Sequence, residues 1–366
     1  MNSPAFFEHG GNVYAVARQT GAVPERLLDY SANINPLGLP SSAADAVRDA
    51  LAGVVNYPDA AAAALKDAIA RRYGVAAELI TCGNGAAELL YVLCHMRRPR
   101  RVLVVAPTFC EYERAARAAG AAVAYCHLAA ADGFALDPAA FAAKLTGIDI
   151  AFLCNPNNPT GRLIPRAAVE TIAATAARQG AWLVVDESFL DFLPGAADHT
   201  CRPLLASYSN LIVLQSLTKF YAIPGLRLGF VLADPAVGAL LNRGKDPWNV
   251  NSLAQAAGVA ALADDAYRAA SIAVVASARE DFAHGLAALP GLQPFPACAN
   301  FILARLAGVT APALRQAMLR DGILIRDCGN YPGLSSAYIR LAVKLPEQNA
   351  CVLAALGKNL KDGSSS

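Results

Sequence analysis

Three side chains suited to holding a small phosphorylated aldehyde follow one predicted strand. Ser216 and Lys219 come directly after the apolar run Leu211–Leu214, and Arg227 follows eight residues after the lysine. An amine in apolar surroundings has a lowered pKa and forms a Schiff base more readily. An isolated S-x-x-K is more often a surface lysine beside a serine turn, and the arginine at this spacing favours the chemical interpretation.

Further side chains suited to a flat, cationic ring follow other predicted strands. Asp186 ends the run Trp182–Val185, where an unpaired carboxylate is costly, so we expect a cationic partner such as a protonated pyridine nitrogen. Asn158 lies in a rigid turn, N-P-N-N-P-T-G at 155–161, and Phe109 is suited to stacking on a ring. A helix cap, turn building and core packing are the competing structural roles.

A glycine-containing turn, Gly83–Gly85, joins a predicted strand to a predicted helix. Small residues there let backbone N–H groups approach a phosphate, although a plain strand–helix turn also uses glycine. Glu88 stands where a Rossmann fingerprint has its third glycine, and no Gly-Lys-Ser/Thr of a P-loop follows. The turn could bind a phosphate, but it matches neither a Rossmann fingerprint nor a P-loop.

The elements that must position these residues alternate along the chain. Apolar runs separated by alanine-rich helical stretches are typical of a mostly parallel sheet covered on both faces. Ligands bind at the carboxyl ends of the strands in such sheets, where the polar residues above fall. The candidate strands are Leu79–Cys82, Val102–Ala106, Ala122–Tyr125, Asp149–Cys154, Trp182–Val185, Leu211–Gln215 and Leu228–Leu232.

The predicted fold class is α/β, with a large domain around a mostly parallel seven-stranded sheet and a smaller α+β domain. Weaker strands are expected around Asn300–Leu303, Ile323–Arg326 and Ala337–Val343, and the beginning of the chain is rich in loops. The expected divisions are an N-terminal arm that joins the small domain (1–45), the large domain (46–248), the C-terminal small domain (249–357) and a disordered tail (358–366).

Composition limits the partners of this 366-residue chain. Its net charge is +2 and 16% of its residues are charged, which argues against nucleic-acid binding. Its apolar runs of about five residues are far shorter than the roughly 20 that a membrane span needs. The nine cysteines and five histidines lack metal-ligand spacing. We expect reduced, buried thiols, no metal, no membrane partner and a cytoplasmic location.

The N-P-x-N-P-T-G, V-D-E and S-x-x-K…R motifs together resemble the pyridoxal-phosphate enzymes of the aspartate-aminotransferase fold, fold type I, over about residues 5–357. The resemblance implies pyridoxal 5′-phosphate as cofactor. Lys219 would bind its aldehyde covalently and Asp186 would pair with its ring nitrogen. Asn158 would donate to its phenolic oxygen, and Phe109 would stack on the ring.

The same resemblance assigns the cofactor phosphate to residues from three segments. They are Gly85, Ala86, Ser216 and Arg227. Tyr57, in the sequence N-Y-P-D, matches a tyrosine that reaches the phosphate of the neighbouring subunit, which implies a homodimer.

Two branches of the fold compete. The opening H-G-G-N at His9, the run D-Y-S-A-N-I-N-P-L-G from Asp29 and I-R-D-C-G-N-Y from Ile325 resemble L-threonine-O-3-phosphate decarboxylases of cobalamin biosynthesis. Phe189 stands where aminotransferases usually carry a tyrosine that bonds the phenolic oxygen. Histidinol-phosphate aminotransferases share the remaining pattern and are the alternative.

The decarboxylase resemblance implies a small phosphorylated amino acid as substrate. Carbon dioxide would leave, and Lys219 would protonate the α-carbon to give (R)-1-aminopropan-2-yl phosphate. The implied substrate-binding residues are His9, Gly10, Asn33, Asn158, Arg326 and Arg340. The aminotransferase alternative needs a 2-oxoglutarate half-reaction. A cofactor-bound regulatory protein would need a degraded site, and only Phe189 departs from the pattern.

Overall fold

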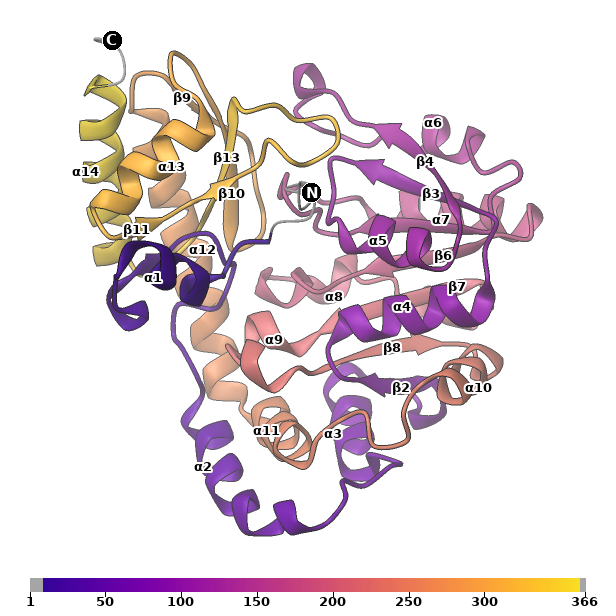
Figure 1. The fold of residues 1–366 in the computed structure, drawn as a ribbon. Helices are drawn as coiled ribbons and strands as arrows, with labels where there is room; N and C mark the ends of the chain where they lie inside the picture. The colour runs from indigo at the N-terminus through magenta and orange to yellow at the C-terminus, as the bar shows by residue number, and fades with distance from the viewer. Residues whose placement is uncertain (1–8, 363–366) are drawn as a thin grey trace.

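A seven-stranded sheet forms the centre of the computed structural model, which describes residues 9–362 (Figure 1). Its order is β2-β8-β7-β6-β5-β3-β4; β8 runs antiparallel to both neighbours, and the other pairs are parallel. The strands are β2 (Ile80–Gly83), β3 (Arg101–Ala106), β4 (Ala122–His127), β5 (Ile150–Cys154), β6 (Trp182–Asp186), β7 (Leu211–Ser216) and β8 (Gly229–Ala233). All seven predicted strands and the mostly parallel arrangement are confirmed.

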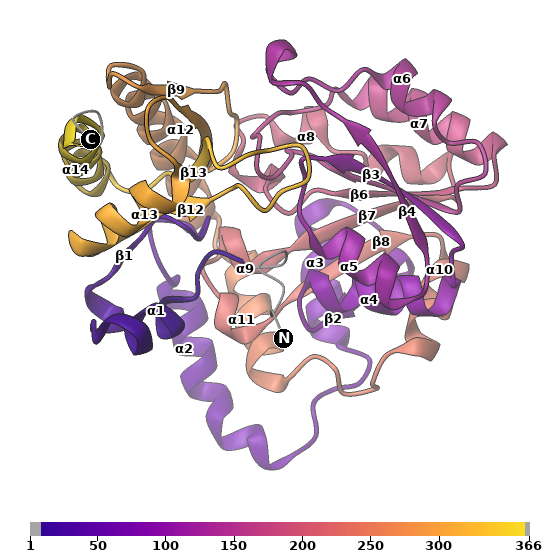
Figure 2. The ribbon, with the colours of Figure 1, turned by 45° about the horizontal axis from the view of Figure 1, so that its top comes forward.

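Helices cover both faces of this sheet because alternate residues of a buried strand point to opposite sides. In β3, Leu103 and Val105 join one core cluster, whereas Val102 and Val104 join another. The first is closed by α3 (Ala63–Tyr73), α6 (Pro138–Ala143), α7 (Arg166–Arg178) and α11 (Ser252–Ala263). The second is closed by α4 (Ala86–Arg97), α5 (Glu111–Ala118) and α10 (Pro235–Gly244). Figure 2 shows α4 and α5 on one side of the strands and α6 and α7 on the other.

The smaller α+β domain lies beside one edge of the large one (Figures 1 and 2). Its antiparallel sheet has the order β12-β13-β10-β9, and three helices pack on it. These elements are β9 (Leu292–Pro294), β10 (Phe301–Leu306), β12 (Arg326–Asp327), β13 (Tyr338–Ala342), α12 (Asp265–Ala287), α13 (Ala311–Arg320) and α14 (Pro346–Asp362). Strands therefore occur in all three regions where weak ones were expected.

The N-terminal arm packs on the small domain. After α1 (Val13–Thr20), β1 (Leu28–Asp29) pairs in parallel with β11 (Ile323–Leu324). Tyr30 is fully buried in the small-domain core, and its hydroxyl donates to Asn349 Oδ1 at 2.8 Å. The chain then enters the large domain through α2 (Ser41–Ala50), which packs against α11.

Two segments differ from the predicted boundaries. Helix α11 was expected in the small domain, yet Ala254 and Ala257 lie in the large-domain core, so we place the junction at α12. The prediction of a disordered tail from Lys358 is wrong for the part of it that the structure describes, because α14 continues through it. Leu360 packs in the small-domain core, and the Lys358 ammonium lies 3.1 Å from Asp321.

The remaining elements are short. They are η2 (Pro24–Arg26), η3 (Leu51–Val55), η4 (Ala77–Leu79), η5 (Ala130–Asp132), η6 (Leu190–Phe192), α8 (Ala196–His199), η7 (Arg202–Ala206), α9 (Leu217–Phe220) and η8 (Pro224–Leu226). All nine cysteines are free; the prediction of buried thiols is wrong for Cys351, which is exposed on α14. Within residues 9–362, no helix has the length and apolar character needed to cross a membrane.

Candidate active site

The carboxyl ends of β5, β6 and β7 and the beginning of α4 open into one cavity of about 610 Å³. It gathers most of the residues that sequence analysis singled out: His9, Gly10, Asn33, Ala86, Phe109, Asn158, Asp186, Ser216, Lys219, Arg227 and Arg340. Gly85 directly precedes Ala86, Arg326 lines an adjoining cavity of about 640 Å³, and Tyr57 lines neither. We locate the chemistry in the slightly smaller cavity because it contains Lys219 and Asp186.

Lys219 lies on α9, the short helix that follows β7. Ser216 precedes this helix, and its hydroxyl accepts from Thr218 N at 3.4 Å. The Lys219 Nζ donates to Thr218 Oγ1 at 3.0 Å. Burial, together with the positive charge of Arg227, lowers the pKa of Lys219 to about 8. The amine is therefore deprotonated more easily than a free lysine, as the apolar sequence around it predicts.

Asp186, the last residue of β6, presents a buried carboxylate to the cavity. Its Oδ2 accepts from the Tyr112 hydroxyl at 2.7 Å, and its Oδ1 accepts from Ser188 N at 2.9 Å. Burial raises the pKa of Asp186, and these hydrogen bonds oppose that rise. A cation at the open side of the carboxylate would favour its ionised form. The sequence did not indicate Tyr112, because its role depends on the face that α5 turns to the cavity.

Glycine makes the phosphate side of the cavity possible. Gly85 has a φ of 81°, and a Cβ built there would collide with the Arg227 guanidinium. A Cβ on Gly229 would lie 2.6 Å from Ala86 N, at the beginning of α4. The backbone N–H groups of that helix and the Arg227 side chain can therefore approach the same anion closely.

The Asn-Pro turn after β5 directs one amide into the cavity. Asn155 Nδ2 donates to Ile164 O at 2.9 Å, and Asn157 is bonded within the turn, so both build the loop. Asn158 Oδ1 accepts from Arg340 Nη1 at 2.5 Å, which leaves its amide nitrogen as the donor. This agrees with a donor that points into the site.

Two arginines face each other across neighbouring strands of the small domain. Arg326 on β12 pairs in register with Arg340 on β13, and both are buried. Residues directly opposite in an antiparallel pair project to the same face. Arg340 Nη2 donates to Ser31 O at 2.5 Å, whereas Arg326 Nη2 donates to Asn330 Oδ1 at 2.8 Å and lies over the Tyr331 ring. Arg340 thus lines the cavity that contains Lys219, and Arg326 lines the adjoining one.

His9 reaches the large domain beside Phe109. Its ring centroid lies 5.7 Å from that of Phe109, and its Nε2 lies 2.6 Å from Glu111 Oε1. Cys110 Sγ is 3.8 Å from both ring nitrogens, and this thiol is only half-buried, whereas buried thiols were expected. Donor atoms of His9, Cys110 and Glu111 lie within 4.8 Å of one another. Because Arg114 Nη1 already donates to Glu111 Oε1 at 2.6 Å, an added metal ion is disfavoured, and we assign none.

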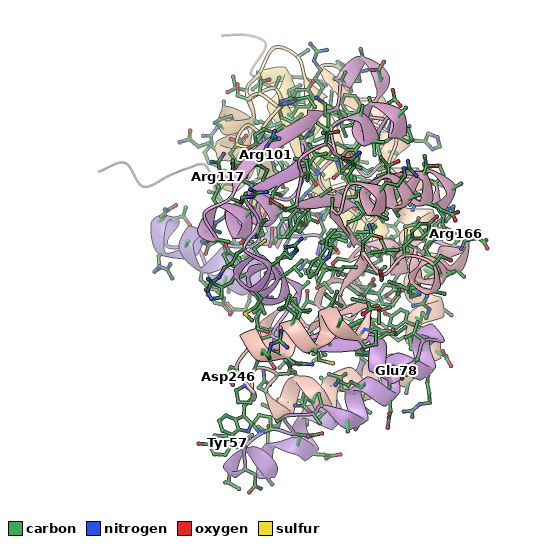
Figure 3. All side chains as sticks on the ribbon, turned by 90° about the vertical axis from the view of Figure 1, so that its right-hand side faces the viewer. Tyr57, Glu78, Arg101, Arg117, Arg166 and Asp246 are labelled. Atoms are coloured by element: carbon green, nitrogen blue, oxygen red, sulfur yellow. The ribbon has the colours of Figure 1, made fainter. Side chains whose placement is uncertain are left out.

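Two aromatic residues bear on the choice of chemistry. Phe189 lines the cavity and packs edge-on against Phe301, with ring centroids 5.0 Å apart. As a phenylalanine, it has no hydroxyl to donate to a ligand. Tyr57 is 77% exposed and stacks on Trp248 at 4.4 Å. Figure 3 shows it at the periphery of the molecule. A role for Tyr57 in a site therefore requires a second chain.

Comparison with known proteins decides the family. The model of the family "Aminotransferase class I and II" matches residues 25–356. The chain belongs to this family. It is 41% identical to the threonine-phosphate decarboxylase of Salmonella typhimurium over 95% of each chain. It is 36% identical to histidinol-phosphate aminotransferase 2 of Ralstonia nicotianae, over 95% of this chain and 92% of that one.

Solved structures agree with this membership. L-threonine-O-3-phosphate decarboxylase from Porphyromonas gingivalis has a TM-score of 0.82 and 28% identity, covering 92% of this chain and 100% of that one. The fold is thus that of the fold type I pyridoxal-phosphate enzymes, and this class I and II family member is an enzyme that uses pyridoxal 5′-phosphate. The lysine, the buried carboxylate and the glycine-lined phosphate side described above fit that cofactor.

Proposed function

We propose that this enzyme decarboxylates L-threonine O-3-phosphate to (R)-1-aminopropan-2-yl phosphate in cobalamin biosynthesis. The observation that carries the proposal is the register pair Arg326–Arg340, two buried guanidiniums on one face of the small-domain sheet. A substrate with a carboxylate and a phosphate has an anion for each. The 41% identity to a threonine-phosphate decarboxylase supports the same substrate.

The residues of this chain determine which substrate bond breaks. Pyridoxal phosphate, when bound, withdraws electrons from a bond at the substrate α-carbon. Arg340 would hold the carboxylate and Arg326 the phosphate, and fixing both ends would orient the bond between the α-carbon and the carboxylate for cleavage. The carboxylate then leaves as carbon dioxide. Lys219 Nζ donates a proton to the α-carbon in its place, so one proton is consumed.

Phe189 supports decarboxylation over amino transfer. Its ring lies against Phe301 and supplies no donor for the phenolic oxygen of the cofactor, which leaves Asn158 as the recognised side-chain donor. The alternative function is that of a histidinol-phosphate aminotransferase, which the 36% identity to the Ralstonia enzyme favours. Amino transfer also needs Lys219 and Asp186, so these two residues do not distinguish the two functions.

We also propose that the enzyme is a homodimer. Several large apolar side chains of η3 and the residues after it are exposed, as is Trp248, on which Tyr57 stacks, and exposed apolar surface of this kind is typical of a protein interface. The exposed side chains are Leu51, Val54, Val55, Tyr57 and Trp248. Tyr57 would reach the phosphate site of the partner. Sedimentation should show a dimer, and a mixed dimer of Tyr57→Phe and Lys219→Ala subunits should have an activity that depends on which site receives both lesions. A fully active monomer would exclude this assembly.

Product analysis tests the reaction. The holoenzyme incubated with L-threonine O-3-phosphate and no 2-oxo acid should release one carbon dioxide per substrate. In a parallel reaction, histidinol phosphate and 2-oxoglutarate should yield little glutamate. Rapid glutamate formation in the second reaction, without carbon dioxide in the first, would assign the aminotransferase function instead.

A further inference from the structure

Glu111 is a buried carboxylate at the edge of the cavity, and the chemistry above gives it no role. Its Oε2 accepts from the Tyr91 hydroxyl at 2.8 Å. Its Oε1 accepts from Arg114 Nη1 at 2.6 Å and lies 2.6 Å from His9 Nε2. Burial would raise the pKa of Glu111, but the hydrogen bonds from His9, Tyr91 and Arg114 lower it to about 2. The carboxylate is therefore ionised and can only accept hydrogen bonds.

An ionised Glu111 dictates the protonation of His9. Because the carboxylate only accepts, His9 Nε2 must carry a hydrogen. Hydrogen bonds to Cys110 and Glu111 outweigh partial burial and raise the pKa of His9 to about 9. At neutral pH the ring is thus an imidazolium whose Nδ1 also carries a hydrogen. Since Arg114 and His9 together outweigh the charge of Glu111, this cluster is positive by one unit.

This imidazolium lies at the junction of the two cavities. His9, Gly10, Ser31 and Tyr331 line both of them. The arm that carries the ring is held closely: a Cβ on Gly10 would collide with Ser31 O, and Gly11 N donates to Ser31 Oγ at 2.7 Å. His9 is thus fixed by its own arm on one side and by α5 of the large domain on the other.

We propose that Glu111 is a positioning residue that holds the His9 ring doubly protonated at the junction of the cavities, where it recognises the phosphate dianion of the substrate. This inference rests on the proposed function for the identity of the phosphorylated substrate. A dianion at this junction would find His9 and Arg326, two cationic groups on different segments that line the same cavity.

The role of Glu111 predicts a pH window for phosphate binding. A phosphate monoester is mostly dianionic above about pH 6. The His9 charge, with its pKa at about 9, is present below that pH and is lost above it. Because the Cys110 hydrogen bond is the larger cause of this rise, loss of Glu111 should lower the pKa of His9 only part of the way toward the ordinary imidazole value of about 6.5. Cys110 contacts the His9 ring, and the other charged or titratable groups that line the two cavities are Asp29, Tyr112, Arg114, Cys154, Asp186, Lys219, Arg227, Arg315, Arg326, Asp327, Tyr331 and Arg340.

The test compares Glu111→Gln with Glu113→Gln in the holoenzyme. Glu113 is equally buried on α5 and pairs with Arg117 at 2.7 Å, but it does not line either cavity. Calorimetry would give the dissociation constant of inorganic phosphate at pH 6 and pH 8. At pH 8 we expect Glu111→Gln to bind phosphate more weakly than wild type, by up to about tenfold, the effect of one charge-assisted hydrogen bond. At pH 6 the difference should nearly vanish, and Glu113→Gln should match wild type at both values.

His9→Asn keeps the test decisive if Glu111→Gln does not fold. It removes the ring, so binding should be about tenfold weaker at both pH values, and Glu111→Gln should add nothing in that background. Comparison of its NMR spectrum with wild type also identifies the His9 resonance, which should titrate near pH 9 in wild type and at a clearly lower pH in Glu111→Gln.

The outcomes separate this inference from the proposed function. Wild-type phosphate binding by Glu111→Gln at pH 8, or a His9 resonance that titrates near 6.5 in wild type, would overturn the role of Glu111. If phosphate binding and the titration behave as expected but L-threonine O-3-phosphate yields no carbon dioxide, the proposed reaction is wrong and the role of Glu111 stands.

Discussion

The cofactor side and the substrate side of the cavity are built in different ways. On the cofactor side, Asp186 and Lys219 follow neighbouring strands of one sheet, and their hydrogen-bond partners come from the same large domain. On the substrate side, His9 belongs to the arm and Arg340 to the small domain, and their partners come from other segments. The edge of a single sheet positions the side chains on the cofactor side. On the substrate side, their positions depend on how the arm, the small domain and the large domain pack together.

Hydrogen bonding shows the same contrast. Among the described residues, Asn33 Oδ1 and Arg340 Nε are buried without a partner, and both residues line the substrate side. An unsatisfied buried polar group costs about 1–3 kcal/mol. A ligand that supplies a donor to Asn33 and an anion to Arg340 would recover that cost. The substrate side therefore gains its last interactions from the ligand, whereas the carboxylate of Asp186 is already bonded twice.

Removing the lysine should break the cofactor side most completely. Lys219→Ala loses both the covalent link and the proton donor, so turnover should fall by roughly 10²–10⁴-fold or more. Borohydride reduction followed by peptide mass spectrometry should find the cofactor on Lys219 in wild type and nowhere in the variant. Lys144→Ala, at an exposed site, is the control. A reducible adduct that persists in Lys219→Ala would show that another amine holds the cofactor.

A change of charge at Asp186 should have the next largest effect. Asp186→Asn keeps the shape of the side chain and an acceptor for Tyr112, but it loses the negative charge that pairs with the ring nitrogen. One charge-assisted hydrogen bond is worth about 1.5–3 kcal/mol, so the cofactor should bind roughly ten- to hundredfold more weakly. Equilibrium dialysis measures this directly. Unchanged cofactor affinity and turnover would mean that another group fills the role.

The substrate side should respond to Arg326 without a change at the cofactor. Arg326→Ala should lower kcat/KM for L-threonine O-3-phosphate by about ten- to hundredfold, because one charged partner of the phosphate is lost. The cofactor dissociation constant should stay at its wild-type value. Arg305→Ala, at an exposed position of β10 in the same sheet, serves as the matched control. Equal losses in cofactor and substrate binding would erase the distinction between the two sides.

The smallest expected effect concerns stability of the apoenzyme. The pKa of Lys219 is lowered from 10.5 to about 8, so between these values the unfolded chain binds more protons and stability rises with pH. The cost of burying the ammonium is thus fully present below about pH 8 and disappears toward 10.5. Apo Lys219→Met should be more stable than wild type at pH 7, and denaturant titration should show this gain shrinking by pH 10. A gain independent of pH would assign it to packing alone.

The same contrast explains what the sequence could predict. Lys219, Asp186 and Asn158 were identified because each lies directly after a buried apolar run, and a parallel sheet brings such ends to one edge. Glu111 and Tyr112 were missed because their importance depends on the face that α5 turns to the cavity. No local pattern marked that face.

Long-range placement was harder to predict. The sequence indicated Arg326 and Arg340 as substrate ligands, but only the pairing of β12 with β13 puts them opposite each other. It placed α11 in the wrong domain because an alanine-rich helix with apolar residues on several sides does not reveal its neighbours. Such a helix is compatible with either core.

The central claim is that the carboxylate of the substrate, rather than its amino group, leaves. L-threonine O-3-phosphate labelled with ¹³C in its carboxyl group, incubated with the holoenzyme in D₂O, tests it directly by NMR. The account predicts ¹³C-labelled carbon dioxide and bicarbonate, with one deuterium on the carbon that carried the carboxyl group. Retention of the label in a 2-oxo acid, with the amino group transferred to added 2-oxoglutarate, would contradict it.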